Sequence, residues 1–195
     1  MTDIEILELM IRTEARVPVQ KDPNGKTFVE LRDAQAPDSR VTVNGIPEDA
    51  IVIKTDAFPA PDKVFTGAND ECKRSDYLII AETSRNTYVV HIEMKRTKDP
   101  QHEIISQLKG SACFFRYCQE IGVEFYLQKE FLKSAKERFI SFGYTGMNKR
   151  QTRVTPQFGI HDRPDKLLKI DAPHYLYFDK LVGNWPQTLG RVNPL

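Results

Sequence analysis

The sequence has no long hydrophobic run, and this absence sets the first limit on its class. No stretch of about 18 consecutive apolar residues occurs in the 195 positions, so the sequence predicts no transmembrane helix. The first residues also lack the basic segment followed by an apolar segment that is typical of a secretory signal peptide. We therefore expect a cytoplasmic protein that does not have a membrane as a partner.

Cysteine is scarce, and the motifs of several common enzyme classes are missing. The three cysteines form neither a CxxC pair nor a Cys/His spacing typical of a zinc site. Their odd number fits reduced thiols, and we expect Cys113 and Cys118 to be buried as small apolar side chains. His102, His161 and His174 show no ligand spacing. A glycine-rich phosphate-binding loop and a GxSxG nucleophile motif are also absent from the sequence.

Charge of one sign is not in excess either. The sequence contains 28 Lys and Arg residues against 27 Asp and Glu residues, a net charge of +1 at pH 7. A general basic field for nucleic acid is therefore excluded, and a binding surface for such a partner has to be a local patch. The length suits a single α/β domain over residues 1–195, because two full domains would be cramped.

Two strand-like segments within residues 74–97 are the most informative stretch of the chain. Both are rich in β-branched and aromatic residues, and about four turn-forming residues separate them, which predicts an antiparallel hairpin. If Glu82 pairs with Thr87 across the turn, then Asp76 stands opposite Glu93 at the open end. The pairs in between follow from the same register: Ile80 with Val89, and Leu78 with His91.

Asp76, Glu93 and Lys95 share one face of this hairpin, because Lys95 lies two residues beyond Glu93. Two carboxylates directly opposite each other destabilise a hairpin, so their pairing favours a cation between them. The strand after Asp76 is apolar on both faces, which indicates a central buried strand. A solvated sheet face is the alternative explanation of the same charges. We favour a metal site, since hard carboxylate oxygens suit Mg²⁺ or Mn²⁺.

Caps, turns and periodicity predict the other elements. A capping box at the N-terminus predicts a helix over about residues 3–15. Asp99-Pro100, followed by an apolar stripe, predicts a helix over about 100–120. A strand over 123–127 would then complete a right-handed crossover onto a parallel neighbour. Further strands are expected over 27–31, 41–43, 51–55, 138–142, 167–170 and 175–178.

Asp76, followed about 17 residues later by Glu93-Met94-Lys95 on a hairpin, resembles the motif of the PD-(D/E)XK nuclease superfamily. A preceding helix and a following crossover helix fit the same family, and Ser75 stands where the family name has proline. The resemblance covers about residues 1–130, as a nuclease core, and leaves 131–195 as a C-terminal extension of strands and loops. It implies an α/β, restriction-endonuclease-like fold with a mixed central β-sheet flanked by helices.

The residue types and the resemblance together give a set of metal ligands. Asp76 and Glu93 would hold one or more Mg²⁺ or Mn²⁺ ions, and the Ile92 carbonyl is a candidate third ligand. Exonuclease-like branches of the family often add a glutamate from the first helix, which would be Glu14. A metal bound in this way lowers the pKa of a bound water and stabilises charge on a scissile phosphate.

Other side chains would serve the reaction itself. Lys95 would position or activate the attacking water and counter negative charge at the phosphorus. The resemblance implies that Gln107, on the helix after the motif strand, hydrogen-bonds the phosphate or the nucleophile. His91 lies on the same face, one step inside the acid pair, where it either orients Glu93 or packs as a core histidine.

We therefore expect a Mg²⁺-dependent deoxyribonuclease that hydrolyses phosphodiester bonds, with weak sequence preference or targeting by a protein partner. By family analogy it would belong to an antiviral defence, repair or mobile-element system and act with a partner or as a homodimer. The alternatives are an RNase on the same scaffold and a nuclease-derived binding or scaffolding subunit that does not cut. Basic residues that could track a nucleic-acid backbone, or simply be solvated, are Lys95, Arg96, Lys98, Lys133, Lys136, Arg138, Lys149, Arg150 and Arg153.

Overall fold

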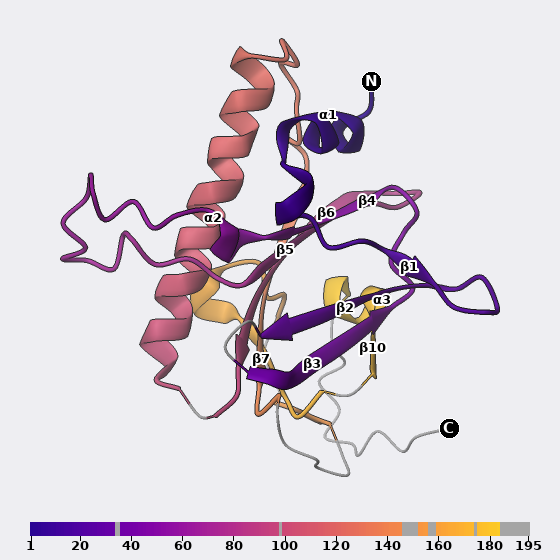
Figure 1. The fold of residues 1–195 in the computed structure, drawn as a ribbon, viewed down its shortest axis with the longest axis vertical. Helices are drawn as coiled ribbons and strands as arrows, with labels where there is room; N and C mark the ends of the chain where they lie inside the picture. The colour runs from indigo at the N-terminus through magenta and orange to yellow at the C-terminus, as the bar shows by residue number, and fades with distance from the viewer. Residues whose placement is uncertain (34–35, 98, 146–151, 156–158, 174, 184–195) are drawn as a thin grey trace.

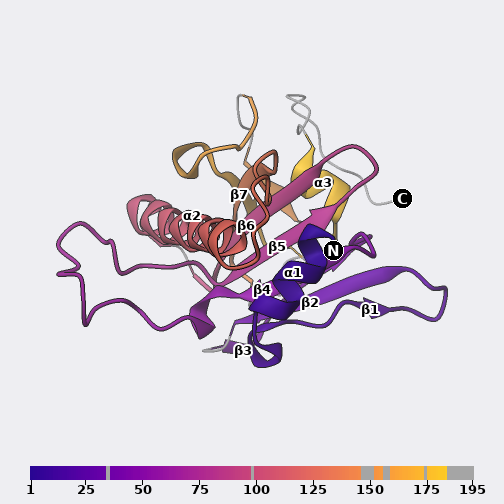
Figure 2. The ribbon, with the colours of Figure 1, turned by 90° about the horizontal axis from the view of Figure 1, so that it is seen from above.

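The computed structural model describes residues 1–33, 36–97, 99–145, 152–155, 159–173 and 175–183. Within these residues the chain is α/β, and a mixed main sheet forms its centre (Figure 1). Helices α1 (Asp3–Met10) and α2 (Gln101–Glu124) cover one face of the main sheet, and a smaller second sheet covers the other face (Figure 2). The α/β class predicted from the sequence is therefore confirmed.

The main sheet contains the predicted hairpin at its centre. Its strands, in spatial order, are β4 (Ala50–Lys54), β5 (Tyr77–Glu82), β6 (Thr87–Lys95), β7 (Lys136–Gly143), β9 (Leu168–Asp171) and β8 (Arg153–Val154). The β4, β5 and β6 strands are antiparallel, whereas β7 and β9 run parallel to β6. Three strands that follow residue 130, β7, β8 and β9, therefore belong to the same sheet as the hairpin.

The predicted register of the hairpin is confirmed. Glu82 pairs with Thr87, and the pairing continues without a shift to Tyr77 opposite Ile92. Strand β5 is buried along almost its whole length, because it lies between β4 and β6 with a hydrophobic layer on each face. Asp76 precedes β5 by one residue, so continuing the register places it opposite Glu93.

Helix α2 follows the hairpin as predicted, and it is longer than expected. The helix continues past Gly122 to Glu124, and the absent side chain of Gly122 makes room for the Phe131 ring. The predicted strand over 123–127 is therefore wrong, and the parallel neighbour of β6 is β7. Cys118 lies on the buried stripe of α2, as predicted, but Cys113 lies off that stripe and is exposed.

The second sheet packs on the main sheet through a shared hydrophobic core. It consists of β1 (Gln20–Lys21), β2 (Thr27–Asp33), β3 (Ala36–Asn44) and β10 (Tyr175–Tyr177), and the short helix α3 (Phe178–Val182) follows. The Tyr77 hydroxyl joins the two sheets, since it donates to the Arg32 carbonyl and accepts from the Arg32 N–H at 3.1 Å. This contact brings the end of β2 to the start of β5.

Helix α1 has the predicted capping box, with reciprocal bonds between Thr2 and Glu5. It ends at Met10, earlier than the predicted residue 15, because the chain becomes extended at Ile11 and then runs beside β4. Short 3-10 turns lie at Thr13–Ala15, Thr55–Ala57 and Pro164–Lys166. Among the helices of the described residues, none has the length and apolar character needed to cross a membrane.

Candidate metal-dependent active site

The predicted acid pair and lysine gather at the open end of the hairpin, on the face covered by α2. Leu78 and His91 face α2, and Asp76 and Glu93 each lie two residues from them, so these two acids point to the same side. The face is apolar near the turn and charged at the open end, as the register predicts. Bringing these groups together is thus a consequence of the twofold side-chain period of the strands.

Glu93 is a buried carboxylate with one satisfied oxygen. Its side chain is 1% exposed, and Oε1 accepts a bond from Lys95 Nζ at 2.9 Å. Lys95 Nζ is also 2.9 Å from the Asp99 carboxylate, so the ammonium bridges two acids. The other Glu93 oxygen, Oε2, is buried and has no hydrogen-bond donor among the residues that the structure describes. An orphaned buried carboxylate oxygen is costly, so it indicates a missing ligand at this position.

Asp76 is held by the backbone of both neighbouring strands. Its Oδ2 accepts a 2.7 Å hydrogen bond from the Met94 N–H on β6. Its carbonyl accepts from the Thr55 N–H at 2.9 Å, just after β4. The carboxylate is therefore fixed at the end of β6, beside the charge of Lys95, which acts on both acids.

Burial and mutual repulsion make both acids reluctant to lose their protons. Burial raises the pKa of Glu93 to about 8, with a further rise from the negative charge of Asp76, while Lys95 opposes the shift. Burial likewise raises the pKa of Asp76 to about 6, against the Met94 hydrogen bond and the Lys95 charge. Burial lowers the pKa of Lys95, but Glu93 and Asp99 outweigh it, so the pKa lies above its ordinary value. A further cation would offset this repulsion.

Gln107 lies on α2 at the level of Glu93. Ser111 of α2 contacts His91 of β6, and α2 runs back along β6 in the opposite direction. From Ser111 to Gln107 the helix spans about 6 Å, and from His91 to Glu93 the strand spans about 6.6 Å. Gln107 therefore lies at the level of Glu93. Gln107 Oε1 is buried and, within the described part of the chain, makes no hydrogen bond. Gln107, which the family resemblance implied, thus provides a second unsatisfied oxygen at the level of Glu93.

Among the described residues, the structure shows no contact that joins two of the predicted metal ligands, Glu14 and Ile92, to this centre. Glu14 lies in the 3-10 turn after α1, with an exposed side chain, and β4 separates this segment from β5. Ile92 lies in the interior of the main sheet, opposite Tyr77 in β5 and Ile140 in β7. Both assignments stay predictions.

Acids outside the predicted set of metal ligands act on the centre or on the elements beside it. The negative charges of Asp33 and Asp56 act on Asp76, although Asp33 comes from the second sheet. Asp99, expected as a helix cap, instead forms the ion pair with Lys95, and Pro100 occupies the cap position. Asp70 accepts a 2.8 Å bond from Ser106 on α2. Lys95 ends β6 and Asp99 precedes α2, so the helical i, i+4 rule does not mark Asp99, and Asp33 has no local signal either.

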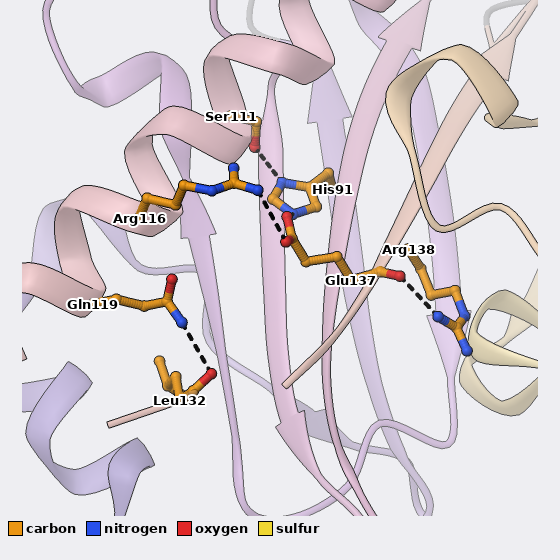
Figure 3. A network of polar contacts seen from close by, with 7 residues as sticks. All are labelled: His91, Ser111, Arg116, Gln119, Leu132, Glu137 and Arg138. Atoms are coloured by element: carbon orange, nitrogen blue, oxygen red, sulfur yellow. Dashed lines mark hydrogen bonds and ion pairs between the residues drawn. The ribbon is translucent and has the colours of Figure 1, made fainter. Parts of the chain in front are cut away.

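His91 is a core histidine, one of the two interpretations left open by the sequence. It is fully buried, and its Nδ1 lies 2.8 Å from Ser111 Oγ and its Nε2 3.1 Å from Glu137 (Figure 3). Its ring stacks on Phe139 with centroids 4.4 Å apart. Arg116 reaches from α2 to the same Glu137 carboxylate at 3.4 Å. Both ring nitrogens therefore have partners other than Glu93.

The basic residues do not form one continuous track. Arg138 is buried, and its guanidinium donates to the carbonyls of Val182 and Glu137. Lys136 aligns with Tyr88 at the turn end of the hairpin, about 20 Å along the strands from the Lys95 end. The Arg138 guanidinium is therefore engaged within the protein, and Lys136 lies far from the acid pair. Lys98, Lys149, Arg150 and also His174 lie outside the described residues.

Comparison of the chain with protein-family models, with curated proteins and with solved structures gave no significant match. The geometry of the centre therefore carries the functional argument. In the part of the chain that the structure describes, no three His, Cys, Asp or Glu side chains converge as a ready-made metal cage. Mg²⁺ is ordinarily bound by one or two carboxylates together with waters and substrate phosphates, which fits Asp76 and Glu93.

Proposed function

We propose that the protein is a metal-dependent nuclease that hydrolyses DNA phosphodiester bonds at the Asp76–Glu93 centre. The observation that carries this proposal is the Glu93 carboxylate, which is buried, bound to Lys95 through one oxygen, and without a hydrogen-bond donor on the other among the described residues. A group built only for stability would have both oxygens satisfied.

The arrangement of elements supports the same proposal. Helix α1 precedes the strands β4, β5 and β6, and α2 then crosses over to the parallel strand β7. This agrees with the preceding helix, acid-bearing hairpin and crossover helix on which the resemblance to the PD-(D/E)XK superfamily rests. We propose that the main sheet with α1 and α2 is a restriction-endonuclease-like core.

The centre fits a hard divalent cation such as Mg²⁺ or Mn²⁺. Asp76 and Glu93 would hold it, since both are carboxylates and Glu93 Oε2 has no other ligand within the described residues. When bound, such an ion supplies charge stabilisation at the phosphate and a more acidic water. The same ion would oppose the effects of burial and of the Asp76 charge, which together raise the pKa of Glu93 to about 8.

The remaining side chains have roles that follow from their contacts. Lys95 is fixed between Glu93 and Asp99, so its ammonium can hold the attacking water and counter charge at the phosphate oxygens. Gln107 has a buried Oε1 that can accept a hydrogen bond from that water without adding charge. Asp76 cannot turn away, because the Met94 N–H holds its carboxylate. Lys95 and Asp76 are thus oriented before substrate binds.

Cleavage of plasmid and single-stranded DNA with Mg²⁺ or Mn²⁺ tests the proposal. We expect cutting that EDTA abolishes and that Lys95→Ala removes, while Lys136→Ala, an exposed lysine at the opposite end of the same sheet, cuts like the parent. Parallel assays with RNA separate a deoxyribonuclease from an RNase. Metal-independent DNA binding without turnover would instead identify a non-catalytic binding subunit and contradict the proposal.

A further inference from the structure

A polar row extends from the acid pair across the next two strands of the main sheet. Glu93 aligns with Ser141 on β7, and Ser141 aligns with Lys169 on β9. Residues aligned on neighbouring strands share a face, and about 10 Å separates the first strand from the third. Ser141 is fully buried, and in the described residues its hydroxyl has no hydrogen-bond partner. The polar surface of the centre is therefore wider than the hairpin.

Gly143 of β7 makes room for the Asp171 side chain of β9. A Cβ atom at Gly143 would lie 2.3 Å from Asp171 Oδ1, so this carboxylate occupies the space that a side chain would fill. The same Cβ atom would lie 3.8 Å from Lys169 Cε, which is ordinary van der Waals contact. Gly143 itself aligns with Lys95, so Asp171 and the stem of Lys169 lie beside the row that contains Lys95.

Lys169 borders a cavity of about 180 Å³ beside the centre. The cavity lies between the first turn of α2 and β9, and it is lined by Asp99, Gln101, Ile104, Thr155, Leu167 and Lys169. Asp99 is held by its ion pair with Lys95, which it shares with Glu93. Lys169 is half-buried, and its ammonium forms no ion pair within the described chain. A half-buried lysine without a counter-ion, next to a cavity, favours an anionic ligand.

We propose that this cavity is a phosphate subsite, in which Lys169 binds the phosphate of a nucleotide adjoining the scissile one. The inference rests on the proposed nuclease function and names a second contact to the same substrate strand. The distance of about two strand spacings from Glu93 is a step that one or two nucleotide units can span. Phosphate binding by an ammonium is a point-charge contact, which positions the strand without reading its sequence.

Asp171 has the opposite influence on this subsite. Its Oδ1 is buried above Gly143 and receives no hydrogen bond from the described residues, so its negative charge competes with a phosphate for Lys169. The two residues therefore have opposite expected effects. Lys169→Ala weakens nucleic-acid binding, and Asp171→Asn strengthens it.

Binding of a short fluorescent single-stranded oligodeoxynucleotide, measured in Ca²⁺ to prevent turnover, tests the subsite. For Lys169→Ala we expect roughly tenfold or more weaker binding and a shallower salt dependence by about one phosphate contact. Lys169→Arg restores part of the affinity. Lys166→Ala, an exposed lysine on the turn before β9, serves as the control and leaves the affinity unchanged. Equal affinities of the Lys169→Ala and Lys166→Ala proteins would overturn the subsite, as would weaker binding by Asp171→Asn.

Oligonucleotides with and without a terminal phosphate distinguish the two sources of the bound group. If Lys169→Ala loses affinity only for the phosphorylated oligonucleotide, the subsite binds a terminal phosphate. If it loses the same affinity for both oligonucleotides, the subsite binds an internal phosphate. Either result supports the subsite. Cleavage assays on the same proteins separate the two proposals. A parent that cuts DNA while Lys169→Ala changes neither KM nor affinity retains the nuclease function and loses the subsite. A parent that binds through Lys169 but never cuts retains the subsite and loses the nuclease function.

Discussion

Two buried polar clusters lie on the same face of the main sheet, and they are built in opposite ways. In the His91 cluster, both ring nitrogens have partners, and Glu137 is shared between His91 and Arg116 (Figure 3). In the acid centre, the repulsion between Asp76 and Glu93 is only partly relieved by Lys95. One Glu93 oxygen also lacks a donor among the described residues.

The difference shows how a structural cluster can be told from a functional one. Buried polar groups that satisfy each other stabilise a fold, whereas an unsatisfied group is retained at a cost to stability. The pKa values follow the same division. Burial raises the pKa of Glu137, but His91 and Arg116 outweigh it and leave that pKa below its ordinary value. The pKa of Glu93 is instead raised to about 8. Glu93 and Glu137 differ both in burial, with side chains 1% and 23% exposed respectively, and in their partners.

The largest expected effect comes from removing the charge of Glu93. Glu93→Gln should lower the rate of DNA cleavage at least about a hundredfold, because it removes a metal ligand and the partner of Lys95. At pH 8 without metal, its melting temperature should be no lower than that of the parent, since a repelled carboxylate is gone. Cleavage assays and thermal unfolding measure both effects. If the Glu93→Gln protein cut DNA like the parent, the acid centre would not be the functional cluster of the two.

Disrupting the satisfied cluster should instead cost stability. His91→Ala leaves Ser111 and Glu137 without their partner and opens space against Phe139, so the free energy of unfolding should fall by about 2–4 kcal/mol. Urea unfolding measures the change. The folded fraction should retain the parental cleavage rate per molecule. A loss of activity without a loss of stability would place His91 in the reaction.

The pH dependence of stability sharpens the same comparison. Glu93 has a folded-state pKa of about 8, above an ordinary value of 4.5, so between these pH values the folded protein binds more protons than the unfolded chain. The contribution of Glu93 to stability is therefore largest at low pH and is lost as pH rises to 8, by roughly 2–4 kcal/mol. Without metal, the difference in stability between Glu93→Gln and the parent should widen from pH 5 to pH 8, and Mg²⁺ should reduce it. If the stability difference between Glu93→Gln and the parent did not depend on pH, the raised pKa of Glu93 would be contradicted.

The smallest expected effect concerns Gln107. Gln107→Ala should slow cleavage about tenfold, which corresponds to the loss of one hydrogen bond. Lys109→Ala, an exposed substitution two residues further along α2, is the matched control and should cut like the parent. Single-turnover rates of the two variants provide the comparison. Equal rates would remove Gln107 from the centre.

Local rules of sequence predicted the part of the site that lies on neighbouring segments. The twofold period of strands placed Asp76 opposite Glu93, and the helical period placed Gln107 on the sheet-facing side of α2. The contributions of Asp33 and Asp56 depend on how the second sheet and the β4–β5 connection pack, so no local pattern marks them. The true parallel partner of β6 was missed for a similar reason. Helix α2 continues where glycine suggested an end, and Phe131 packs against Gly122.

The most direct test of the central claim is a crystal soaked with Mn²⁺ and measured for anomalous scattering. We predict a peak between the carboxylates of Asp76 and Glu93, with Glu93 Oε2 among the ligands, and no such peak in crystals of Glu93→Gln. A well-ordered centre without a peak, with Glu93 Oε2 hydrogen-bonded to protein, would contradict the account.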